Sequence, residues 1–469
     1  MGFSKYLSNV HDVAKSLIDK LLKKYEYASI LGTHITGYRM SVSPKNKSID
    51  ETPERDFGFV VKIYNGRIFS EYSFNLLKEE LIDQIIMDIE SKLSLDEFLL
   101  NDAMKCELFD DSVLVKTFHR PIQGHNILQP KLIKILEEIK DNCLAYDSRI
   151  VDANIVYGQY ETSKFFISKN RDLCQNYSWI NVSMEVTSKE NDNIKSSYFA
   201  KGYNSPTLAV NVLKEEYKNI CQLSIDLLSS TLIEPGEYDI ICDPSISGLI
   251  AHEAFGHGVE MDMFVKDRAL AKQYVNKQVA SPLVNMHDGA SIIHSSASYF
   301  FDDDGVLASD TTIIKNGILQ TGISDVLSAS ILNSKPTGNG RRESYKRKSY
   351  SRMTNTYFVE GKSKVEDMIK SIEHGYLLSQ TENGMEDPKN WNIQCVCAYG
   401  REIKNGKFTG KIVAPVCMSG NVLDLLNSIS MVSDEIEVIG SGHCGKGYKE
   451  WVVVSDGGPY LKGRCKLGW

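Results

Sequence analysis

The sequence predicts an α+β protein, with a mixed α/β N-terminal domain over residues 1–230 and a largely antiparallel β C-terminal domain over residues 234–469. Three observations lead to this prediction. Short strands followed by long amphipathic helices recur in the first half, which is the pattern of a mixed domain. Glu234-Pro235-Gly236 interrupts that pattern and marks the boundary. Beyond Pro282 the chain has repeated hairpin signals without long helices, which favours antiparallel strands.

Periodicity and turn residues define the elements of the N-terminal domain. Apolar residues at helical spacing predict helices near residues 4–27, 76–93, 130–145 and 206–228. Alternating stretches predict strands at residues 34–43, 57–64, 67–74, 154–160, 164–168, 179–187 and 196–203. Asn65-Gly66 joins the second and third of these strands and is a strong hairpin signal.

The C-terminal domain begins with a strand that leads directly into a helix. Residues 237–242 form an apolar run typical of a buried strand, and Asp243-Pro244-Ser245 is a helix start. Asn316-Gly317 and Asn405-Gly406 then mark two further hairpins, and residues 302–305 (Asp-Asp-Asp-Gly) mark a turn. We therefore expect an antiparallel sheet or barrel, with the helix after residue 243 held rigidly at its start.

Composition limits the classes of function. The 469 residues include 53 Lys+Arg and 61 Asp+Glu, for a formal net charge of −8, and no basic stripe of the kind that binds nucleic acid. No stretch approaches the roughly 20 apolar residues of a membrane span, and the N-terminus lacks a signal-peptide core. The ten cysteines form no CxxC pair. We expect a cytoplasmic protein with free thiols that acts neither on nucleic acid nor in a membrane.

One stretch of the predicted helix carries chemistry, His252-Glu253 followed by His257. Two neutral imidazoles hold a divalent cation, and an adjacent glutamate takes the proton of its bound water. Histidines four apart share one face of an α-helix, but these are five apart, which leaves their side chains about 140° apart. We therefore predict a distorted metal-binding helix with a π-type turn or a break, for which Gly256 supplies backbone freedom. The alternative is two ordinary histidines on a buried helix.

A metal held by two histidines needs a third protein ligand. Cys444 stands in a glycine-rich stretch near the C-terminus, and a thiolate is a common partner of imidazole on zinc. Together with His252 and His257 it would leave one position open for water. Spacing alone does not single it out, because His443 beside it and Glu260 also compete as the third ligand. We favour Glu260 as a partner that orients a histidine.

Together these segments resemble the TldD/PmbA family of bacterial and archaeal metallopeptidases, historically called modulators of DNA gyrase. The resemblance is clearest between about residues 234 and 460. It is carried by His252-Glu253 with His257-Gly258, by Thr337 to Ser344 (Thr-Gly-Asn-Gly-Arg-Arg-Glu-Ser), by Arg352 to Thr356 (Arg-Met-Thr-Asn-Thr), and by Gly442-His443-Cys444-Gly445-Lys446. It implies an α/β N-terminal domain before a largely antiparallel C-terminal domain, and a TldD-like catalytic subunit.

The resemblance also implies a site and an assembly. His252, His257 and Cys444 would bind the metal, with Glu253 as the general base. The metal would be zinc, with iron or another divalent ion as the alternative. The assembly would be a homodimer, or a heterodimer with a TldE/PmbA-like subunit. Unfolded peptides would enter its closed cavity as extended strands, gripped mainly through their backbones.

The expected reaction is hydrolysis of a peptide bond. Water activated by the metal loses its proton to Glu253 and attacks the carbonyl, and Glu253 then protonates the leaving amine. Asn339, Arg341 and Arg342 are candidate substrate-binding residues. Either arginine would hold a substrate carboxylate or stabilise the oxyanion, with a structural salt bridge as the equal alternative. Asn339 would present backbone groups to a peptide or form a turn.

Two other functions compete with a peptidase. A non-catalytic peptide-binding or partner subunit of a heterodimeric protease is the first, although it would not need Glu253 beside the ligands. A DNA- or gyrase-binding regulator is suggested only by the older family name. The acidic net charge argues against it, because DNA binding depends on neutralising phosphates with basic side chains.

Overall fold

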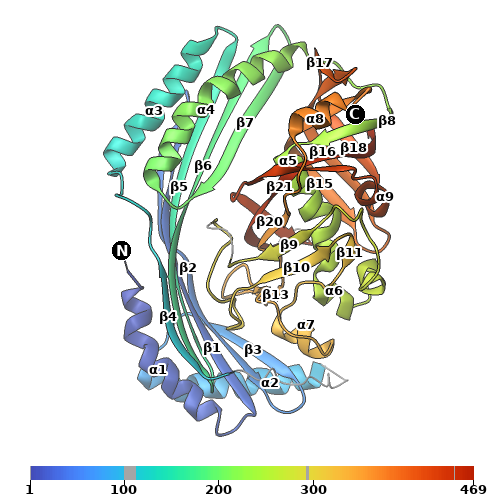
Figure 1. Ribbon diagram of the computed structural model, residues 1–469. Coiled ribbons are helices and arrows are strands. Elements are labelled where there is room, and N and C mark those ends of the chain that lie inside the picture. The colour runs from blue at the N-terminus through green and yellow to red at the C-terminus, as the bar shows by residue number, and fades with distance from the viewer. Residues whose placement is uncertain (1, 100–111, 292–294, 448) are drawn as a thin grey trace.

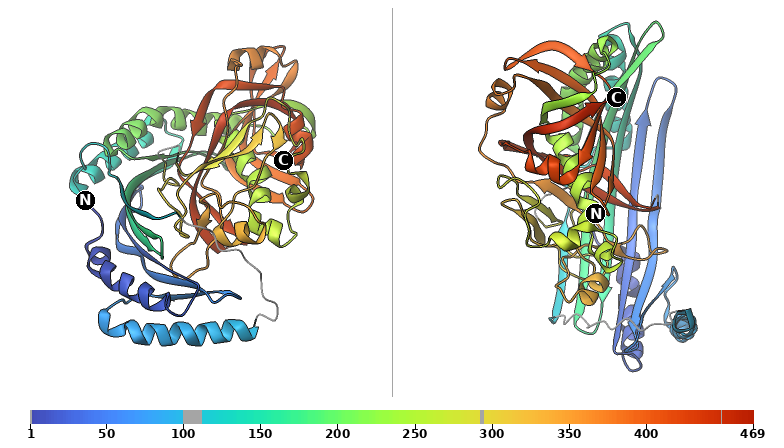
Figure 2. Two further views of the ribbon diagram at one scale, coloured as in Figure 1. Left: turned by 60° about the horizontal axis from the view of Figure 1, so that its bottom comes forward. Right: turned by 90° about the vertical axis from the view of Figure 1, so that its right-hand side faces the viewer.

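The computed structural model describes residues 2–99, 112–291, 295–447 and 449–469. Long strands of the N-terminal half form a curved sheet, and the C-terminal half packs against one of its faces (Figure 1). Helices of the N-terminal half cover the opposite face, as the two turned views also show (Figure 2). The predicted fold class, a mixed α/β N-terminal part before a largely antiparallel C-terminal part, is confirmed.

The N-terminal sheet, within the described residues, has the strand order β3-β2-β1-β5-β6-β4, with β7 paired to β6. Its strands are β1 (Tyr27–Val42), β2 (Lys47–Tyr64), β3 (Phe69–Phe74), β4 (Leu114–Arg120), β5 (Ile150–Ile167), β6 (Arg171–Glu190) and β7 (Asn193–Tyr203). Neighbouring strands are antiparallel except for β4 and β6. The hairpin predicted at Asn65-Gly66 is confirmed, since Tyr64 pairs with Phe69 across the turn.

One strand of this sheet is longer than its sequence suggests. The sequence predicts two strands at residues 154–160 and 164–168, but the structure has the single strand β5, so this prediction is wrong. The polar residues between them, 161–163, do not interrupt it, because β1 and β6 pair with both of its edges there. A strand whose backbone groups are bonded on both sides is not ended by polar side chains alone.

Apolar layers fix the helices on the outer face of the sheet. The helices are α1 (Lys5–Leu21) and α2 (Ile82–Leu99) at one end, and α3 (Gln129–Tyr146) and α4 (Pro206–Asp226) at the other. α1 begins at Ser4, whose side chain accepts the backbone N–H of Leu7. Its buried residues include Leu7, Val10, Ala14, Leu17 and Leu21. Burying each of the larger ones contributes about 1.5–3 kcal/mol, which holds the helix against the sheet.

The C-terminal sheet, over the described ranges, has the order β11-β10-β9-β14-β21-β18-β16-β15-β8, with β17 on β16 and with β19 and β20 on β21. Its strands are β8 (Gly236–Cys242), β9 (Met286–Gly289), β10 (Asp310–Lys315), β11 (Ile318–Leu319), β14 (Asn355–Phe358), β15 (His374–Asp387), β16 (Asn392–Lys404), β17 (Lys407–Val413), β18 (Val416–Asn421), β19 (Met431–Val438), β20 (Gly442–Lys446) and β21 (Lys449–Gly468). β8 also pairs with β21, which closes five strands into a ring. Most neighbours are antiparallel, and β14–β21 and β15–β8 are parallel.

Short elements connect these strands. They are the helices α5 (Pro244–Leu249), α6 (Met261–Val265), α7 (Val326–Ile331), α8 (Val365–Lys370) and α9 (Val422–Asn427), and the two-residue strands β12 (Gly340–Arg341) and β13 (Tyr350–Ser351). The hairpins predicted at Asn316-Gly317 and Asn405-Gly406 are confirmed as β10–β11 and β16–β17. In the part of the chain that the structure describes, no helix combines the length and the apolar character needed to cross a membrane.

Ion pairs join the two halves where the predicted turn at residues 302–305 meets the N-terminal sheet. Lys62 Nζ lies 2.5 Å from Asp304 Oδ1, and Lys164 pairs with Asp303. All four side chains are largely buried. The acidic turn therefore serves as the contact between the C-terminal half and β2 and β5 of the sheet.

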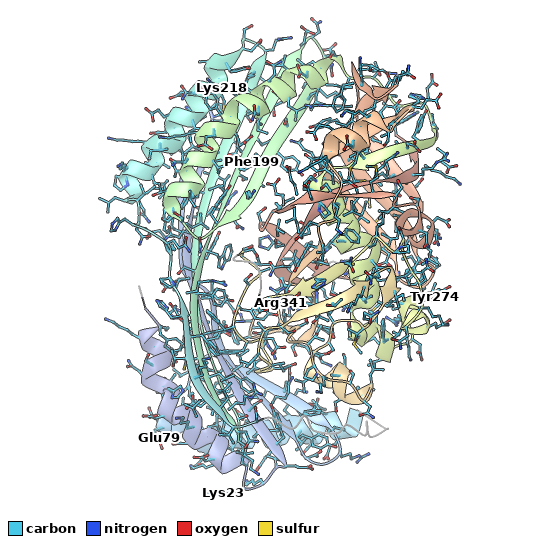
Figure 3. All side chains as sticks on the ribbon, in the orientation of Figure 1. Lys23, Glu79, Phe199, Lys218, Tyr274 and Arg341 are labelled. Atoms are coloured by element: carbon cyan, nitrogen blue, oxygen red, sulfur yellow. The ribbon has the colours of Figure 1, made fainter. Side chains whose placement is uncertain are left out.

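A cleft of about 700 Å³ lies beside these ion pairs, between the two halves. Its walls include Trp179 of β6 and Trp451 of β21. Arg341 also lines it, and Figure 3 shows this residue between the N-terminal sheet and the C-terminal half. Arg342, next in the chain, reaches across to Glu71 of β3 at 3.4 Å.

Candidate metal centre

The predicted metal-binding helix starts at the end of a strand that is paired on both sides. β8 lies between β15 and β21, and α5 follows it after one residue. That residue, Asp243, caps the helix, since its Oδ1 accepts the backbone N–H groups of Ser245 and Ile246, each at 3.0 Å. Pro244 occupies the first helical position, where the missing N–H costs nothing. The start of the helix is thereby held in a fixed position.

The helix is irregular where the two histidines lie. α5 leads into a π-helical segment, Ile250–Gly256, and then into a tight 3-10 turn, His257–Val259. In a π turn the backbone hydrogen bond runs between residues five apart, so residues at that spacing become neighbours on successive turns. The predicted distortion is confirmed, and no straight α-helix runs through His257.

Gly256 serves this turn in a different way from the one predicted. Its φ of −61° and ψ of −49° are ordinary helical values, so no freedom special to glycine is used. A Cβ at this position would lie 2.2 Å from Sδ of Met353 and 2.9 Å from the carbonyl oxygen of Ala251. Close packing requires the glycine here, and the prediction that invoked backbone freedom is wrong.

The structure brings the three predicted metal ligands together, and we call His252, His257 and Cys444 the central cluster. Their donor atoms all lie within 4.8 Å of one another. Nε2 of His257 is 3.3 Å from Sγ of Cys444, and the two imidazole rings are nearly perpendicular with centroids 5.1 Å apart. Cys444 comes from β20, 187 residues beyond His257, and is held there by pairing with Val452 of β21.

The chemistry of the central cluster fits a zinc-like ion. Two imidazoles and a thiolate are preferred zinc ligands and leave the fourth tetrahedral position open. Burial alone would raise the pKa of the Cys444 thiol, but the charges of His257 and His252 hold that pKa well below its ordinary value. Nδ1 of His252 is buried without a hydrogen-bond partner among the described residues. A buried thiolate between two imidazoles is the form in which sulfur binds a metal.

Glu253 lies beside the central cluster. Its Oε1 is 3.9 Å from Nε2 of His252, and its Oε2 is 3.9 Å from Nε2 of His257. Burial raises the pKa of this carboxyl, and the two histidines oppose the rise. Gly384 of β15 packs against the side chain so closely that a Cβ there would lie 2.6 Å from Cγ of Glu253. The neighbouring strand thus holds the carboxylate next to both imidazoles.

A further layer of charged groups surrounds the central cluster. Oε2 of Glu260 is 3.3 Å from Nδ1 of His257, so Glu260 makes the histidine contact that the sequence favours for it. Glu260 also lies 3.0 Å from Nζ of Lys446 and 3.3 Å from Nε of Arg352. Arg352 donates a hydrogen bond of 2.9 Å to the carbonyl oxygen of Cys444. Sequence reasoning missed Arg352 and Lys446 as parts of the site, although both lie in the segments that carry the resemblance.

The three predicted substrate-binding residues have different surroundings. Asn339 is buried, and its amide donates to Asp288 at 2.7 Å. Arg342 pairs with Glu71, which is the salt-bridge alternative stated for this arginine. Arg341 lines the cleft, and its guanidinium donates to two backbone carbonyl oxygens of the C-terminal half. The structure therefore places the arginines, and not the Asn339 side chain, at the cleft.

Two other residues near the site complete its description. His443, the competing third ligand, is exposed on β20 and is not one of the clustered donors, because consecutive residues of a strand point to opposite faces. Glu386 of β15 escaped sequence reasoning. Both of its carboxyl oxygens are buried without a hydrogen-bond partner among the described residues, and a Cβ on Gly258 would lie 2.8 Å from one of them. No motif marks this position.

The sequence of this chain is similar to those of known metalloproteases. Residues 235–462 match the family model described as the PmbA/TldA metallopeptidase C-terminal domain. A metalloprotease of Methanocaldococcus jannaschii is 25% identical over 454 residues, which cover 94% of this chain and 96% of that protein. A metalloprotease TldD homologue of Buchnera aphidicola is 34% identical over 249 residues, 52% of this chain. The chain spans about half the length of that Buchnera relative.

Solved structures share the fold over its whole length. A protein of Bacteroides thetaiotaomicron named as a modulator of DNA gyrase superposes with a TM-score of 0.77 at 18% identity, covering 98% of each chain. TldE from Thermococcus kodakarensis gives a TM-score of 0.75 at 17% identity, covering 97% of this chain and 100% of TldE. At such low sequence identity, the similarity to these structures shows a shared fold and no more. The family model goes further, and by it residues 235–462 of this chain form a C-terminal domain of the PmbA/TldD type.

Proposed function

We propose that this chain is a metal-dependent peptidase in which His252, His257 and Cys444 hold the metal and Glu253 is the general base. The observation that carries the proposal is the convergence of two imidazoles, a thiol and a carboxylate from a distorted helix and a distant strand. Relatives named metalloprotease support it, and one from Saccharolobus solfataricus is named a zinc metalloprotease. We therefore propose zinc as the metal.

Each group of the site has a distinct role in this proposal. A bound divalent ion would supply Lewis acidity, which polarises a peptide carbonyl and makes water more acidic. Glu253 would accept a proton from the attacking water and deliver it to the leaving amine. Glu260 would engage Nδ1 of His257, so that Nε2 of the same ring is the nitrogen turned toward Cys444.

The proposed substrate is a peptide in extended form. The cleft between the two halves lies beside the strand pair that carries Cys444, because Val452, the cross-strand partner of Cys444, and His443 line it. Backbone pairing with an exposed strand edge would bind peptides with little sequence preference. We propose that a second copy of this chain, or a TldE/PmbA-like subunit, closes the cleft into a cavity. The fold of TldE is compatible with such a partner.

A Glu253→Gln variant tests the catalytic proposal, because glutamine keeps the shape of the side chain and removes its basicity. We expect unchanged metal content and a fall of about 100-fold or more in the cleavage of an unstructured peptide. Cleavage at the rate of the intact protein would overturn the assignment of Glu253 as the base.

A second experiment, with the intact chain, distinguishes an enzyme from a binding subunit. The intact chain is assayed alone and mixed with a TldE/PmbA-like subunit, while peptide binding is followed by fluorescence anisotropy. Binding of the peptide without cleavage in either mixture would favour the non-catalytic peptide-binding subunit over the peptidase.

A further inference from the structure

A second group of metal-binding side chains lies in the N-terminal half. His11 of α1 and Asp172 and Cys174 of β6 place their donor atoms within 4.8 Å of one another, and we call them the outer cluster. Nε2 of His11 is 2.9 Å from Oδ1 of Asp172. All three residues are partly buried, so an ion would reach them from solvent without any opening of the fold.

Strand geometry separates the outer cluster from the cleft. Asp172 and Cys174 are two residues apart on β6 and therefore point to the same face of the sheet. Leu173 between them points to the opposite face, where it packs with Phe301 of the C-terminal half. α1 lies on the outer side of the sheet (Figure 1). The sheet thus stands between the outer cluster and the proposed peptide-binding cleft.

Packing positions the donors in advance. The ring of His11 meets Phe165 edge-on, with centroids 5.5 Å apart, which restricts its rotation. Cys174 packs against the apolar layer beneath α1. Asp172 accepts from Lys15, one helical turn after His11, at 2.5 Å through Oδ2, and this leaves Oδ1 directed toward His11. Little side-chain entropy would be lost when these donors meet an ion.

The donor set selects the class of ion. One imidazole nitrogen, one carboxylate oxygen and one thiol sulfur suit zinc and neighbouring first-row ions, whereas calcium and magnesium need more oxygen ligands. Around tetrahedral zinc such donors stand about 3.3–3.8 Å apart, from bond lengths of about 2.0–2.3 Å. Side-chain shifts of about 1 Å would bring the outer cluster to that spacing.

We propose that His11, Asp172 and Cys174 form a second divalent transition-metal site, of the zinc type, that joins α1 to β6. Its ligands come from elements 161 residues apart, so a bound ion would link the first helix to the sheet. The fourth position would be taken by water. The site stabilises the N-terminal half and is independent of the proposed peptidase activity.

Cobalt(II) titration of the full chain tests this proposal, because a thiolate bound to cobalt gives a charge-transfer absorption band. The Cys444→Ala variant removes the thiolate of the central cluster, and we expect a thiolate–cobalt band to persist in it. The band should disappear in Cys444→Ala/Cys174→Ser and persist in Cys444→Ala/Cys143→Ser. Cys143 is the control, since it lies on α3 and is buried in a separate apolar layer. Absence of the band in Cys444→Ala, or its persistence in Cys444→Ala/Cys174→Ser, would overturn the proposal.

Zinc content provides a second measurement in which the central cluster stays intact. We expect about two zinc ions per chain in the unaltered protein and in Cys143→Ser, and about one in Cys174→Ser and in His11→Ala. Peptide cleavage should stay within about two-fold in all of these variants. Equal zinc content in the unaltered protein and in Cys174→Ser would overturn the outer site. Absence of cleavage in the unaltered protein would concern the proposed function instead.

A Lys15→Met variant distinguishes two roles for the outer cluster, metal binding and a purely structural ion pair between Lys15 and Asp172. The lysine is no metal ligand, and its ammonium repels a cation. We therefore expect the variant to bind zinc at the outer cluster at least as tightly as the unaltered protein. Loss of that zinc would show that the Lys15–Asp172 pair is needed to hold the residues together, and would count against a site built from the three donors.

Discussion

The central and outer clusters combine the same kinds of donor in different surroundings. Both include histidine and cysteine with donor atoms within 4.8 Å of one another. Beside the central cluster, Glu253 lies 3.9 Å from each imidazole and, among the described residues, pairs with no lysine or arginine. In the outer cluster the carboxylate of Asp172 belongs to the donor set itself and is paired with Lys15 at 2.5 Å. Under our assignments both clusters would hold a metal, but of the two only the central one has, in the described part of the chain, a base beside it that is free of a competing cation.

The supports of the two clusters also differ. The central cluster depends on a π-helical segment, on a glycine packed against Met353, and on buried charges around Glu260. The outer cluster sits on a regular helix and a regular strand. Irregular backbone and buried charge cost stability, and of the two clusters the central one, to which we assign catalysis, has both.

The largest contrast is expected between Cys444→Ala and Cys174→Ser. Loss of the Cys444 thiolate leaves two imidazoles that hold a metal poorly, so cleavage of an unstructured peptide should fall by roughly 1,000-fold. Cys174→Ser should leave it within about two-fold. The values of kcat/KM for both variants decide the comparison. Similar losses in the two variants would show that the clusters are not independent.

The next contrast compares the carboxylates that support each cluster. Glu260→Gln should weaken zinc binding by about 10–100-fold, because His257 loses the group that orients it. It should also destabilise the fold by about 3 kcal/mol, because the charges of Arg352 and Lys446 remain buried without their partner. In the metal-free protein, Asp172→Asn should cost less than about 1 kcal/mol of stability, since its Lys15 partner is half-exposed. Chelator competition and urea unfolding measure the two effects, and equal costs would contradict the contrast.

Acid titration tests Glu71, a carboxylate that lies between two positively charged side chains and away from the proposed metal ligands. Burial alone would raise the pKa of Glu71, but the charges of Arg342 and Lys62 lower it to about 2. Because this value lies below the unfolded one, the ion pairs stabilise the protein fully above about pH 4.5 and lose their contribution as the pH falls toward 2. The unaltered chain should lose up to about 3 kcal/mol more than Glu71→Gln over that range. Parallel pH profiles of the two urea-unfolding free energies would contradict this assignment.

A more modest effect than the loss of a ligand or of a buried charge is expected from the packing of the π-helical segment. Gly256→Ala should cost about 1–3 kcal/mol, because the added Cβ meets Met353 and the carbonyl of Ala251. Gly468→Ala is the control, since a Cβ there meets nothing within 4 Å. Thermal unfolding and zinc affinity measure the result. Unchanged values for Gly256→Ala would mean that the segment repacks without cost.

Local signals predicted much of the fold. The hairpins at Asn316-Gly317 and Asn405-Gly406 follow directly from their residues, because both residues of each pair adopt positive φ. The π-helical distortion follows from the spacing of two histidines under the assumption that they share a ligand. These features depend on a few adjacent residues, so the sequence alone is sufficient for them.

Features that depend on distant partners were not predictable in the same way. Glu260 meets Lys446 at a separation of 186 residues, and His11 meets Asp172 at a separation of 161. The single strand β5 depends on neighbours that pair with it on both sides. No periodicity in one segment reveals such contacts. The roles of His252, His257 and Cys444 as ligands stay predictions, although the structure brings the three side chains together.

The π-helical segment allows two histidines five residues apart to lie as close together as histidines four apart in an α-helix. A π turn accommodates one residue more than an α turn between the same two ends. A chain shortened by one residue at Ala254 would therefore place the histidines four apart in a regular turn, still on one face of the helix. The residues after the turn would keep their neighbours, while Glu253 would move relative to both imidazoles. The additional residue thus leaves the two histidines on one face, as a shorter regular helix would.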